Sequence, residues 1–251
     1  MRPVKFSTLL CLVLLFSISS TNADYMTPLF SESFDDGMLN LNWVPFPGFS
    51  QDPLMPILDP TSPEGVWAGR QTNQQLGGFA SLSFSGMRHL RDYLMEAWVY
   101  AVVVPEGRAP LNGIAVRVDP QNERFYRFAT HFDAEQRLSF AYVGSDTNNY
   151  PVYIKSWKQA EIPGGVSEKS GWHKMAVRCA GNNFWVYWDE QELPGCPLQD
   201  DRIPGGFFGV YANYVGGKGI VETRVDAIKV MQEARGSTDI NSQNDPGEGG
   251  D

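Results

Sequence analysis

Short segments of strand-like composition follow one another along most of the chain, and this pattern most restricts the folds that the sequence can adopt. Between Tyr25 and Val230 the segments are separated by turns rich in Gly, Pro, Asn and Asp. No stretch of ten or more residues places apolar side chains at helical spacing. The sequence therefore predicts an all-β domain, a sandwich or a barrel. The expected strands are Leu29–Phe34, Val66–Arg70, Gly78–Phe84, Tyr93–Val104, Asn112–Val118, Phe125–Phe132, Arg137–Val143, Trp172–Cys179, Asn183–Trp188, Gly206–Asn213 and Gly219–Met231.

Two of these segments alternate as strands with one buried face do, because successive side chains of a strand point to opposite sides of the sheet. In one segment the apolar positions are Tyr93, Met95, Ala97, Val99 and Ala101, and the other face carries Leu94, Glu96, Trp98 and Tyr100. An acid flanked by aromatic residues is not typical of a core. The segment from Phe125 divides likewise, with Tyr126, Phe128 and Thr130 opposite Arg127, Ala129 and His131.

Residues 1–23 have the three parts of an export signal. Arg2 and Lys5 give a positive start, Phe6–Ser20 is apolar, and Thr21-Asn22-Ala23 is a small-residue cleavage site. The apolar part is shorter than the roughly 20 residues of a membrane span, so no membrane insertion is expected. We therefore expect a secreted protein, extracellular or periplasmic.

The remainder of the chain is expected to form one domain and a tail. Residues 24–232 contain all the predicted strands, whereas residues 233–251 are rich in Gly, Ser, Asn, Asp and Glu and predict a disordered acidic tail. The segment Phe46–Pro63 contains five prolines and no periodicity, which predicts a long loop over one end or face of the domain.

The chain is acidic, with a formal net charge of −9 at pH 7. Nucleic acids and anionic membrane surfaces repel such a protein, so neither is an expected partner. The working expectation for the oligomeric state is a monomer.

Two cysteines follow the export signal, and an exported protein meets oxidising conditions. A disulfide between Cys179 and Cys196 is one interpretation. The alternative is that Cys179 is a small core residue at the end of a strand.

Motifs at both ends of the domain resemble the concanavalin A-like lectin and glucanase superfamily. Leu29-Phe-Ser-Glu-Ser-Phe-Asp-Asp-Gly37 with Trp43 looks like its opening strand, and Gly206-Phe-Phe-Gly-Val-Tyr-Ala212 and Val221-Glu-Thr-Arg-Val-Asp-Ala-Ile-Lys-Val230 look like its closing strands. Between them, Asn112-Gly-Ile-Ala-Val-Arg117, Trp172-His-Lys-Met-Ala-Val177 and Phe184-Trp-Val-Tyr-Trp188 are similar to laminin-G-like domains. The resemblance implies a two-sheet antiparallel β-sandwich of the jelly-roll type, whose concave face commonly presents a glycan groove.

The resemblance implies glycan binding more than catalysis. Family 16 glycoside hydrolases carry a Glu-x-Asp-x-x-Glu strand, which places nucleophile and acid on one face. This chain has no such strand, and it lacks the strand signatures of the alginate lyases that share the fold. Fold alone does not fix function, so the enzyme class is left open with non-catalytic binding preferred.

Aromatic rings and hydrogen-bonding side chains on the middle strands are candidates for a sugar-binding groove, because sugars stack on rings through their apolar faces. The candidates are Glu96, Trp98, Tyr100, Arg117, Arg127 and His131. The alternative is that the aromatic residues belong to the core and the charges face solvent.

Many concanavalin A-like domains carry a structural calcium ion on the convex side, and by position Glu32 and Asp226 match its ligands. The alternative is that Asp226 only accepts hydrogen bonds from a turn.

Three functional hypotheses follow. The leading one is a secreted, non-catalytic domain that recognises a polysaccharide or glycan on its concave sheet. The second is a glycoside hydrolase or polysaccharide lyase with Glu96 and His131 in a groove beneath the loop Phe46–Pro63. The third is a laminin-G-like adhesion module that binds protein.

Overall fold

The computed structural model describes residues 26–40, 43–49, 53–73, 81–102, 109–131, 137–166, 170–215 and 221–233. The expected export signal lies outside these residues, as does the expected acidic tail from residue 234 onward.

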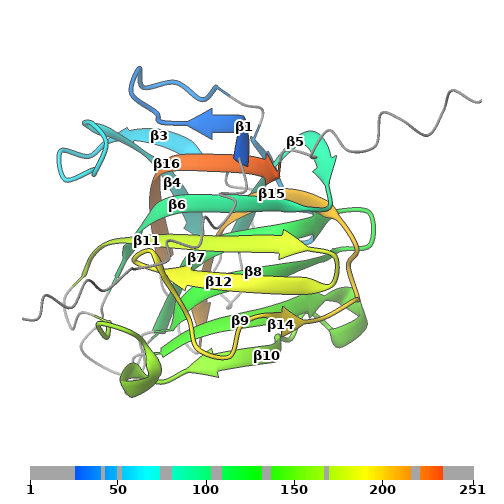
Figure 1. Ribbon diagram of the computed structural model, residues 1–251. Coiled ribbons are helices and arrows are strands. Elements are labelled where there is room, and N and C mark those ends of the chain that lie inside the picture. Colours follow the sequence, from blue (N-terminus) through cyan, green and yellow to red (C-terminus); the bar gives the residue numbers. More distant parts are fainter. Residues whose placement is uncertain are drawn as a thin grey trace, which may run out of the picture.

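Two antiparallel sheets stacked face to face make up the domain, which confirms the predicted β-sandwich (Figure 1). Sheet A has nine strands and sheet B has seven. Along sheet A the order is β13 (Gln191–Glu192), β12 (Asn183–Trp188), β11 (Gly171–Ala180), β6 (Tyr93–Ala101), β16 (Val221–Glu233), β4 (Trp67–Asn73) and β3 (Met55–Leu58); β1 (Met26–Glu32) also pairs with β16, and β14 (Leu198–Gln199) with β12. Along sheet B the order is β10 (Val152–Trp157), β9 (Arg137–Gly144), β8 (Arg124–His131), β7 (Ala109–Asp119), β15 (Gly206–Val215), β5 (Ser81–Leu90) and β2 (Trp43–Pro45).

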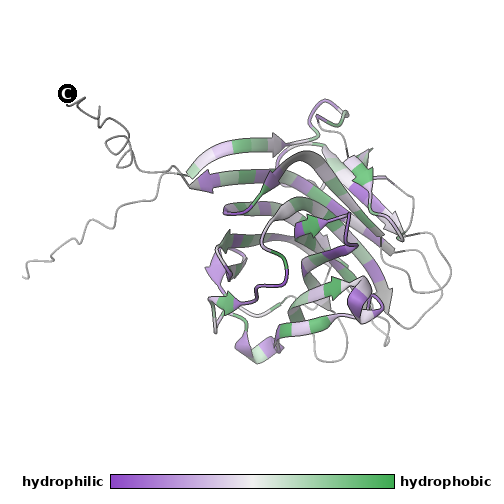
Figure 2. Ribbon diagram, turned by 90° about the vertical axis from the view of Figure 1, so that its right-hand side faces the viewer, coloured by the Kyte–Doolittle hydropathy of each residue, from purple (hydrophilic) through white to green (hydrophobic). Residues whose placement is uncertain are grey.

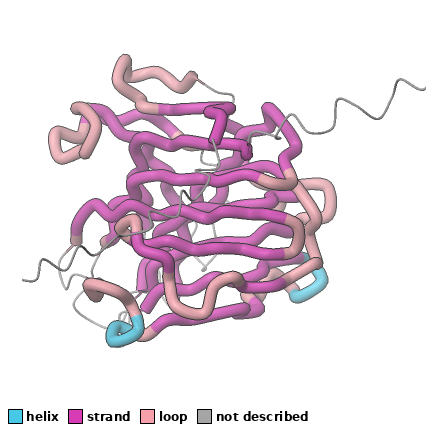
Figure 3. Tube along the Cα trace, in the orientation of Figure 1, coloured by secondary structure: helices cyan, strands magenta, loops and turns pink. Residues whose placement is uncertain are grey.

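Helical structure in the described residues is limited to two single 3₁₀ turns, Ser145–Thr147 and Gln159–Glu161 (Figure 3). No helix among those residues is long and apolar enough to cross a membrane.

The main core lies between the two sheets and follows the alternation that the sequence predicts. In β6 the residues Met95, Ala97 and Val99 are buried in the core, and Glu96 and Trp98 between them are half-buried on the outer side. Ile114 of β7 and Phe128 of β8 belong to sheet B, and their buried side chains fill the same core from that side. Figure 2 shows hydrophilic and hydrophobic residues alternating along the strands, as expected when only one face of each sheet enters the core.

A second apolar cluster lies on the other side of sheet B. It includes Phe84, Phe125 and Tyr211, and the rings of Phe46 and Phe49 pack over it. The first part of the segment Phe46–Pro63 therefore covers one face of the sandwich, as predicted for a long loop.

The prediction that this whole segment is a loop was wrong for Met55–Leu58. These residues form the edge strand β3, paired with β4. Proline is tolerated there because an edge strand hydrogen-bonds on one side only, and Pro56 lies opposite Gly69. Strands β2, β10 and β13 were also missed, and each of them is the last strand at an end of its sheet. Edge strands are short or partly polar, so their sequence pattern is weak.

The two cysteines of the described residues are free thiols in this structure. Cys179 is buried in the core, which agrees with the alternative interpretation of a small core residue. The Cys196 sulfur instead accepts a hydrogen bond from the backbone N–H of Val186, at 3.4 Å. Burial raises the pKa of the Cys179 thiol to about 12.

We expect a thiol assay to find two free thiols in the chain without Cys11 when it is unfolded in denaturant and no reductant is added. The reason is that Cys179 and Cys196 are both free in the structure. In the native protein at pH 8, Cys179 is expected to resist alkylation, since only a thiolate reacts and burial keeps this thiol protonated. A thiol-specific reagent followed by peptide mass spectrometry checks both points. Recovery of a peptide with Cys179 bonded to Cys196 would contradict them.

Candidate functional site

The outer face of sheet A carries aromatic and charged side chains on the neighbouring strands β6, β11 and β12, and these side chains are called the strip below. In the register of β6 with β11, Trp98 lies opposite Lys174, Glu96 opposite Ala176, and Leu94 opposite Arg178. Tyr187 of β12 continues the row of Ala176. Because the alternate residues of β6 are buried in the core, these side chains all point away from it.

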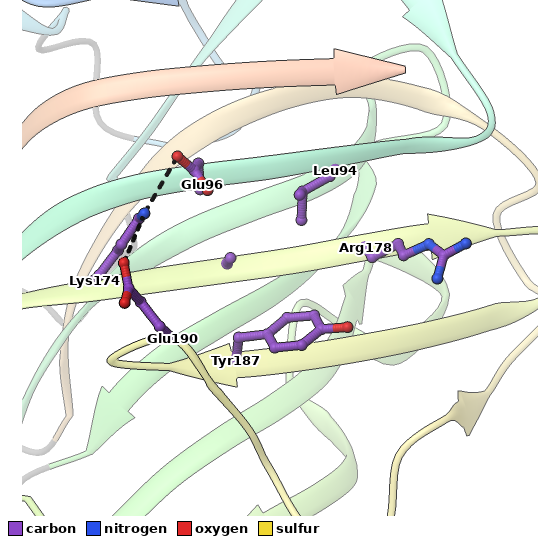
Figure 4. Close-up of a pocket in the computed structure, with 7 residues that line it drawn as sticks. Leu94, Glu96, Lys174, Arg178, Tyr187 and Glu190 are labelled. Carbon is purple, nitrogen blue, oxygen red and sulfur yellow. Dashed lines mark hydrogen bonds and ion pairs between the residues drawn. The ribbon is translucent and has the colours of Figure 1, made fainter. Parts of the chain in front are cut away.

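A pocket of about 290 Å³ opens in this strip (Figure 4). Ala176 has the shortest side chain of the row and forms the floor between longer neighbours. The lining residues are Leu94, Glu96, Lys174, Ala176, Arg178, Tyr187 and Glu190. The pocket therefore combines an apolar floor with charged groups at its rim.

Lys174 lies between two carboxylates at one side of the pocket (Figure 4). Its Nζ is 3.5 Å from Glu96 Oε1 and 3.3 Å from Glu190 Oε1. Burial lowers the pKa of Lys174, but the two carboxylates raise it, and the net pKa is above the ordinary lysine value. The pocket thus contains a permanent ammonium group whose charge is matched by two acids.

A tight turn brings Glu190 to this position. Asp189 and Glu190 join β12 to β13, and both have positive φ angles, 46° and 67°. Two consecutive positive φ angles are typical of the turn that matches the twist of a two-residue hairpin. Asp189 fastens the turn to β11, because its carboxylate accepts a hydrogen bond from the backbone N–H of Lys174 at 3.0 Å.

The aromatic end of the strip contains Tyr100 and Trp172, whose ring centroids are 5.5 Å apart at a steep angle. The Arg224 guanidinium lies 3.8 Å from the centre of the Tyr100 ring and donates to Asp59 Oδ2 at 2.7 Å. Thr61, two residues after Asp59, accepts a hydrogen bond from the Trp172 indole at 3.2 Å. The connection between β3 and β4 is therefore held against this end of the strip.

At the other end of the strip, the Arg178 guanidinium lies 4.9 Å from the centre of the Trp185 ring. Trp98 stands between the two ends and is half-buried. No ring or hydrogen-bonding partner for its indole is found among the described residues. Part of the Trp98 side chain is therefore open to solvent.

The structure separates the predicted groove residues into three places. Glu96, Trp98 and Tyr100 lie together on the outer face of sheet A. Arg127 lies on sheet B, on the face that carries Phe125 and Ala129, and His131 ends the same strand. The side chain of His131 lies outside the described residues. The expectation that the set lines one groove is therefore wrong in geometry.

Arg117 occupies the third place, inside the sandwich. Its guanidinium donates to the backbone carbonyls of Ile203 and Gly181, and it lies 4.7 Å from the centre of the Phe184 ring of sheet A. The pairing of β7 with β8 shifts register between Val116 and Asp119, and Arg117 has φ 49°. This bulge turns the side chain inward, which strict alternation does not predict.

Five aromatic or charged residues of the strip on β11 and β12 were missed by the sequence analysis: Trp172, Lys174, Arg178, Trp185 and Tyr187. Their alternation along the predicted strands was a usable signal. What the sequence did not contain was the pairing that places β11 between β6 and β12.

Glu32 and Asp226, the expected calcium ligands, do not form a shared site. Glu32 accepts hydrogen bonds from the backbone and side chain of Asn40 at 2.8 and 3.2 Å. Asp226 accepts from Ser62 and from the backbone N–H groups of Glu64 and Ala227, the last two at 3.0 and 2.7 Å. N–H donors at these oxygens do not suit a cation, and no metal-like cluster of His, Cys, Asp or Glu occurs among the described residues. Calcium binding stays a prediction without a fitting site.

No family model matches the chain, and no curated protein matches it in sequence. Solved structures do match. The laminarinase catalytic domain from Thermotoga maritima is 11% identical with a TM-score of 0.55, over 84% of this chain and 99% of that one. A family 16 protein of a mixed-linkage glucan locus of Bacteroides ovatus is 14% identical with a TM-score of 0.53, over 80% and 99%.

A third similar structure is an endo-β-galactosidase from Clostridium perfringens that releases GlcNAcα1-4Gal. It is 14% identical with a TM-score of 0.56; the match covers 83% of this chain and 63% of that one, less than two thirds of its length. At these identities the likeness concerns the fold. Together with the two stacked antiparallel sheets, it shows that the chain has the concanavalin A-like jelly-roll fold.

Proposed function

We propose that this protein is an exported carbohydrate-binding domain without catalysis of its own, and that it holds a glycan along the outer face of sheet A. Its partner is a polysaccharide or oligosaccharide. The contact surface is the strip on the outer face of sheet A, which has Trp172 near one end and Trp185 near the other. Export is part of the proposal and is supported by the signal-like residues 1–23.

One observation carries the proposal: a pocket lined by Tyr187 and by the charges of Glu96, Lys174 and Glu190 opens on the outer face of sheet A, and further half-buried aromatic rings lie along the same face. Sugar rings stack their apolar C–H faces on aromatic side chains, and Trp98 offers such a face. Sugar hydroxyls both donate and accept hydrogen bonds, so they suit the Glu96–Lys174–Glu190 group. A few convergent polar groups in a mostly apolar hollow are typical of a small-molecule site.

The length of the strip fits a chain rather than a single sugar. From Leu94 to Tyr100 the strand rises by about 20 Å, at roughly 3.3 Å per residue. The pocket lies beside the first half of this distance, and Tyr100 and Trp172 lie at its far end. Several contact points along one direction favour an extended ligand.

The similar structures support a glycan as the ligand class. Their names describe a laminarinase, a mixed-linkage glucan protein of family 16 and an endo-β-galactosidase, all of which act on or belong with glycans. Because one fold carries many functions, this support is weaker than that of the site itself.

Non-catalytic binding is preferred because the described residues do not offer the paired carboxyl groups of a glycosidase in a working state. Such enzymes need one carboxylic acid and one carboxylate on either side of the scissile bond. Here Lys174 lies between Glu96 and Glu190 and forms ion pairs with both, so neither carboxyl group is free to face a scissile bond. Glu96 and His131 cannot act together, since they belong to different sheets and the Glu96 side chain points away from sheet B.

Replacing Trp98 by Ala is expected to weaken glycan binding by about tenfold or more, which corresponds to about 1.4 kcal/mol. The loss of a stacking surface, with no change to the core, is the physical reason. A glycan array identifies the ligand, and titration calorimetry then compares the parent with the variant. Tyr150→Ala is the matched control, because Tyr150 is an exposed aromatic residue, 74% accessible, in the connection before β10 of sheet B.

Equal affinities for the parent protein and Trp98→Ala would remove the strip as the binding site. Absence of binding to every glycan on the array, together with capture of a protein ligand, would favour the adhesion hypothesis instead.

The enzyme hypothesis is tested with Glu96→Gln, which keeps the shape of the side chain and removes its charge. We expect no release of oligosaccharides or unsaturated ends by either the parent or the variant, since Glu96 is paired with Lys174. Chromatography of digests of the bound polysaccharide measures this. Product formation by the parent that disappears in Glu96→Gln would show catalysis at Glu96.

A further inference from the structure

A two-residue turn at the rim of the pocket holds Glu190 in a backbone conformation that glycine would adopt more easily. Asp189 and Glu190 join β12 to β13, where Trp188 pairs with Gln191, and their φ angles are 46° and 67°. Turns with two positive φ angles prefer Asn or Asp in the first position and Gly in the second. Asp189 fits this preference and Glu190 does not. Because a Cβ atom makes the left-handed conformation costly, the turn is strained at Glu190.

Contacts of the neighbouring residues hold the turn in place. The backbone N–H of Asp189 donates to the Lys174 carbonyl at 2.8 Å, and the backbone N–H of Lys174 donates to Asp189 Oδ1 at 3.0 Å. Asp189 Oδ2 lies 2.8 Å from Nδ1 of His173, whose ring stacks on the buried ring of Trp188 with centroids 4.4 Å apart. None of these contacts uses the side chain of Glu190. The turn is therefore fixed by other residues.

The side chain of Glu190 contributes little to the stability of the fold. It is 76% accessible to solvent, and its hydrogen-bond partner among the described residues is Lys174 Nζ, at 3.3 Å. Exposed ion pairs of this kind stabilise a protein only weakly. Lys174 also has a second carboxylate, that of Glu96, at 3.5 Å. The stability of the fold therefore does not explain a glutamate at this strained position.

The strained residue stands where a ligand in the pocket would contact it. Backbone strain is concentrated at binding and active sites, where it positions a functional side chain. Glu190 lines the pocket, and Figure 4 shows its carboxylate beside the Lys174 ammonium. Oε1 of Glu190 accepts from Lys174, which leaves Oε2 as an acceptor. An ammonium group has three N–H donors, so Lys174 retains one beyond those that face its two carboxylates. This wall of the pocket therefore offers an acceptor and a donor next to each other.

We infer that Glu190 is the specificity-determining residue of the pocket, and that it selects a sugar unit with two adjacent free hydroxyl groups. One hydroxyl donates to the Glu190 carboxylate, and its neighbour accepts from the Lys174 ammonium. The inference rests on the proposed function for the presence of a glycan on sheet A, and it adds which groups of the sugar the pocket recognises. Two carboxylates beside one ammonium leave an excess of negative charge, which disfavours a carboxylated sugar.

The test uses neutral pentasaccharides of glucose, galactose and mannose, each in a 1,4-linked and a 1,3-linked form. Interior units of a 1,4-linked chain have adjacent free hydroxyls at C2 and C3, whereas those of a 1,3-linked chain have no adjacent pair on the ring. We expect the parent to bind the 1,4-linked form of at least one sugar about fivefold or more tightly than its 1,3-linked form. Titration calorimetry measures both affinities.

Glu190→Gly is expected to lose this preference and to bind the 1,4-linked pentasaccharide about tenfold more weakly, because the acceptor is removed. The same variant is expected to unfold at a melting temperature higher by about 2 °C or more, because glycine relieves the strain of the turn. Glu190→Gln keeps the strain and the length of the side chain but removes its charge. We expect Glu190→Gln to lose the preference without the rise in melting temperature.

Glu123→Gly is the matched control. Glu123 is an exposed glutamate with φ 49° in the turn between β7 and β8 of sheet B, far in the strand order from the pocket. The substitution is expected to raise the melting temperature in the same way and to leave both affinities unchanged. A preference for the 1,4-linked form that persists in Glu190→Gly would overturn the inference. So would a lower melting temperature of Glu190→Gly, since Glu190 would then serve the stability of the fold.

Trp98→Ala separates this inference from the proposed function. If Trp98→Ala weakens the binding of both linkages while Glu190→Gly changes neither, the glycan site stands and the role of Glu190 is rejected. Glucosamine and galacturonate pentasaccharides complete the comparison. If the parent binds one of these and no neutral form, and Trp98→Ala abolishes that binding, the proposed function again stands and the inference fails. Absence of binding to every pentasaccharide rejects the inference as well.

Discussion

The pairing register of β6 with β11 and β16 is the constraint on which the rest of the structure depends. It places Met95 and Val99 against the opposite sheet and leaves Glu96 and Trp98 on the outer face. Because side chains alternate along a strand, a slip of one residue would exchange these sets and bury an acid and an indole in an apolar core. The burial that stabilises the sandwich and the exposure that creates the candidate site are thus consequences of the same hydrogen-bond ladder.

The two outer faces of the sandwich have different characters, although both are the reverse sides of core-forming sheets. On sheet A the charges are matched, since Lys174 lies between Glu96 and Glu190, and the aromatic rings are partly open to solvent. On sheet B, Phe46 and Phe49 pack over an apolar cluster, and the fully buried Arg127 has two nitrogens without partners. The first face carries paired charges, and the second carries a buried positive charge for which the described residues provide no ion-pair partner.

The sequence was sufficient for the all-β class, for most central strands and for the inward set of β6, because these depend on alternation and turn residues alone. It was insufficient for the candidate site, because Glu96 and Arg127 look equivalent in the sequence and only the strand order shows that they lie on different sheets. Arg117 shows a second limit, since a bulge with φ 49° reverses the direction that alternation assigns to it. The edge strand β3 shows a third, because its Pro56 would argue against a strand anywhere but at an edge.

The contrast between Lys174 and Arg127 bears on why a jelly-roll of this kind is proposed to bind glycans and not to cleave them. Cleavage needs two carboxyl groups on either side of the scissile bond, whereas Glu96 and Glu190 are both engaged in ion pairs with the same ammonium group. On β8 the described residues include no acid, and the charge at its centre is the guanidinium of Arg127. A guanidinium orients a ligand but does not exchange protons near neutral pH, because its pKa is too high. Among the described residues, the charges at the centres of both faces are therefore ones that can orient a polar ligand.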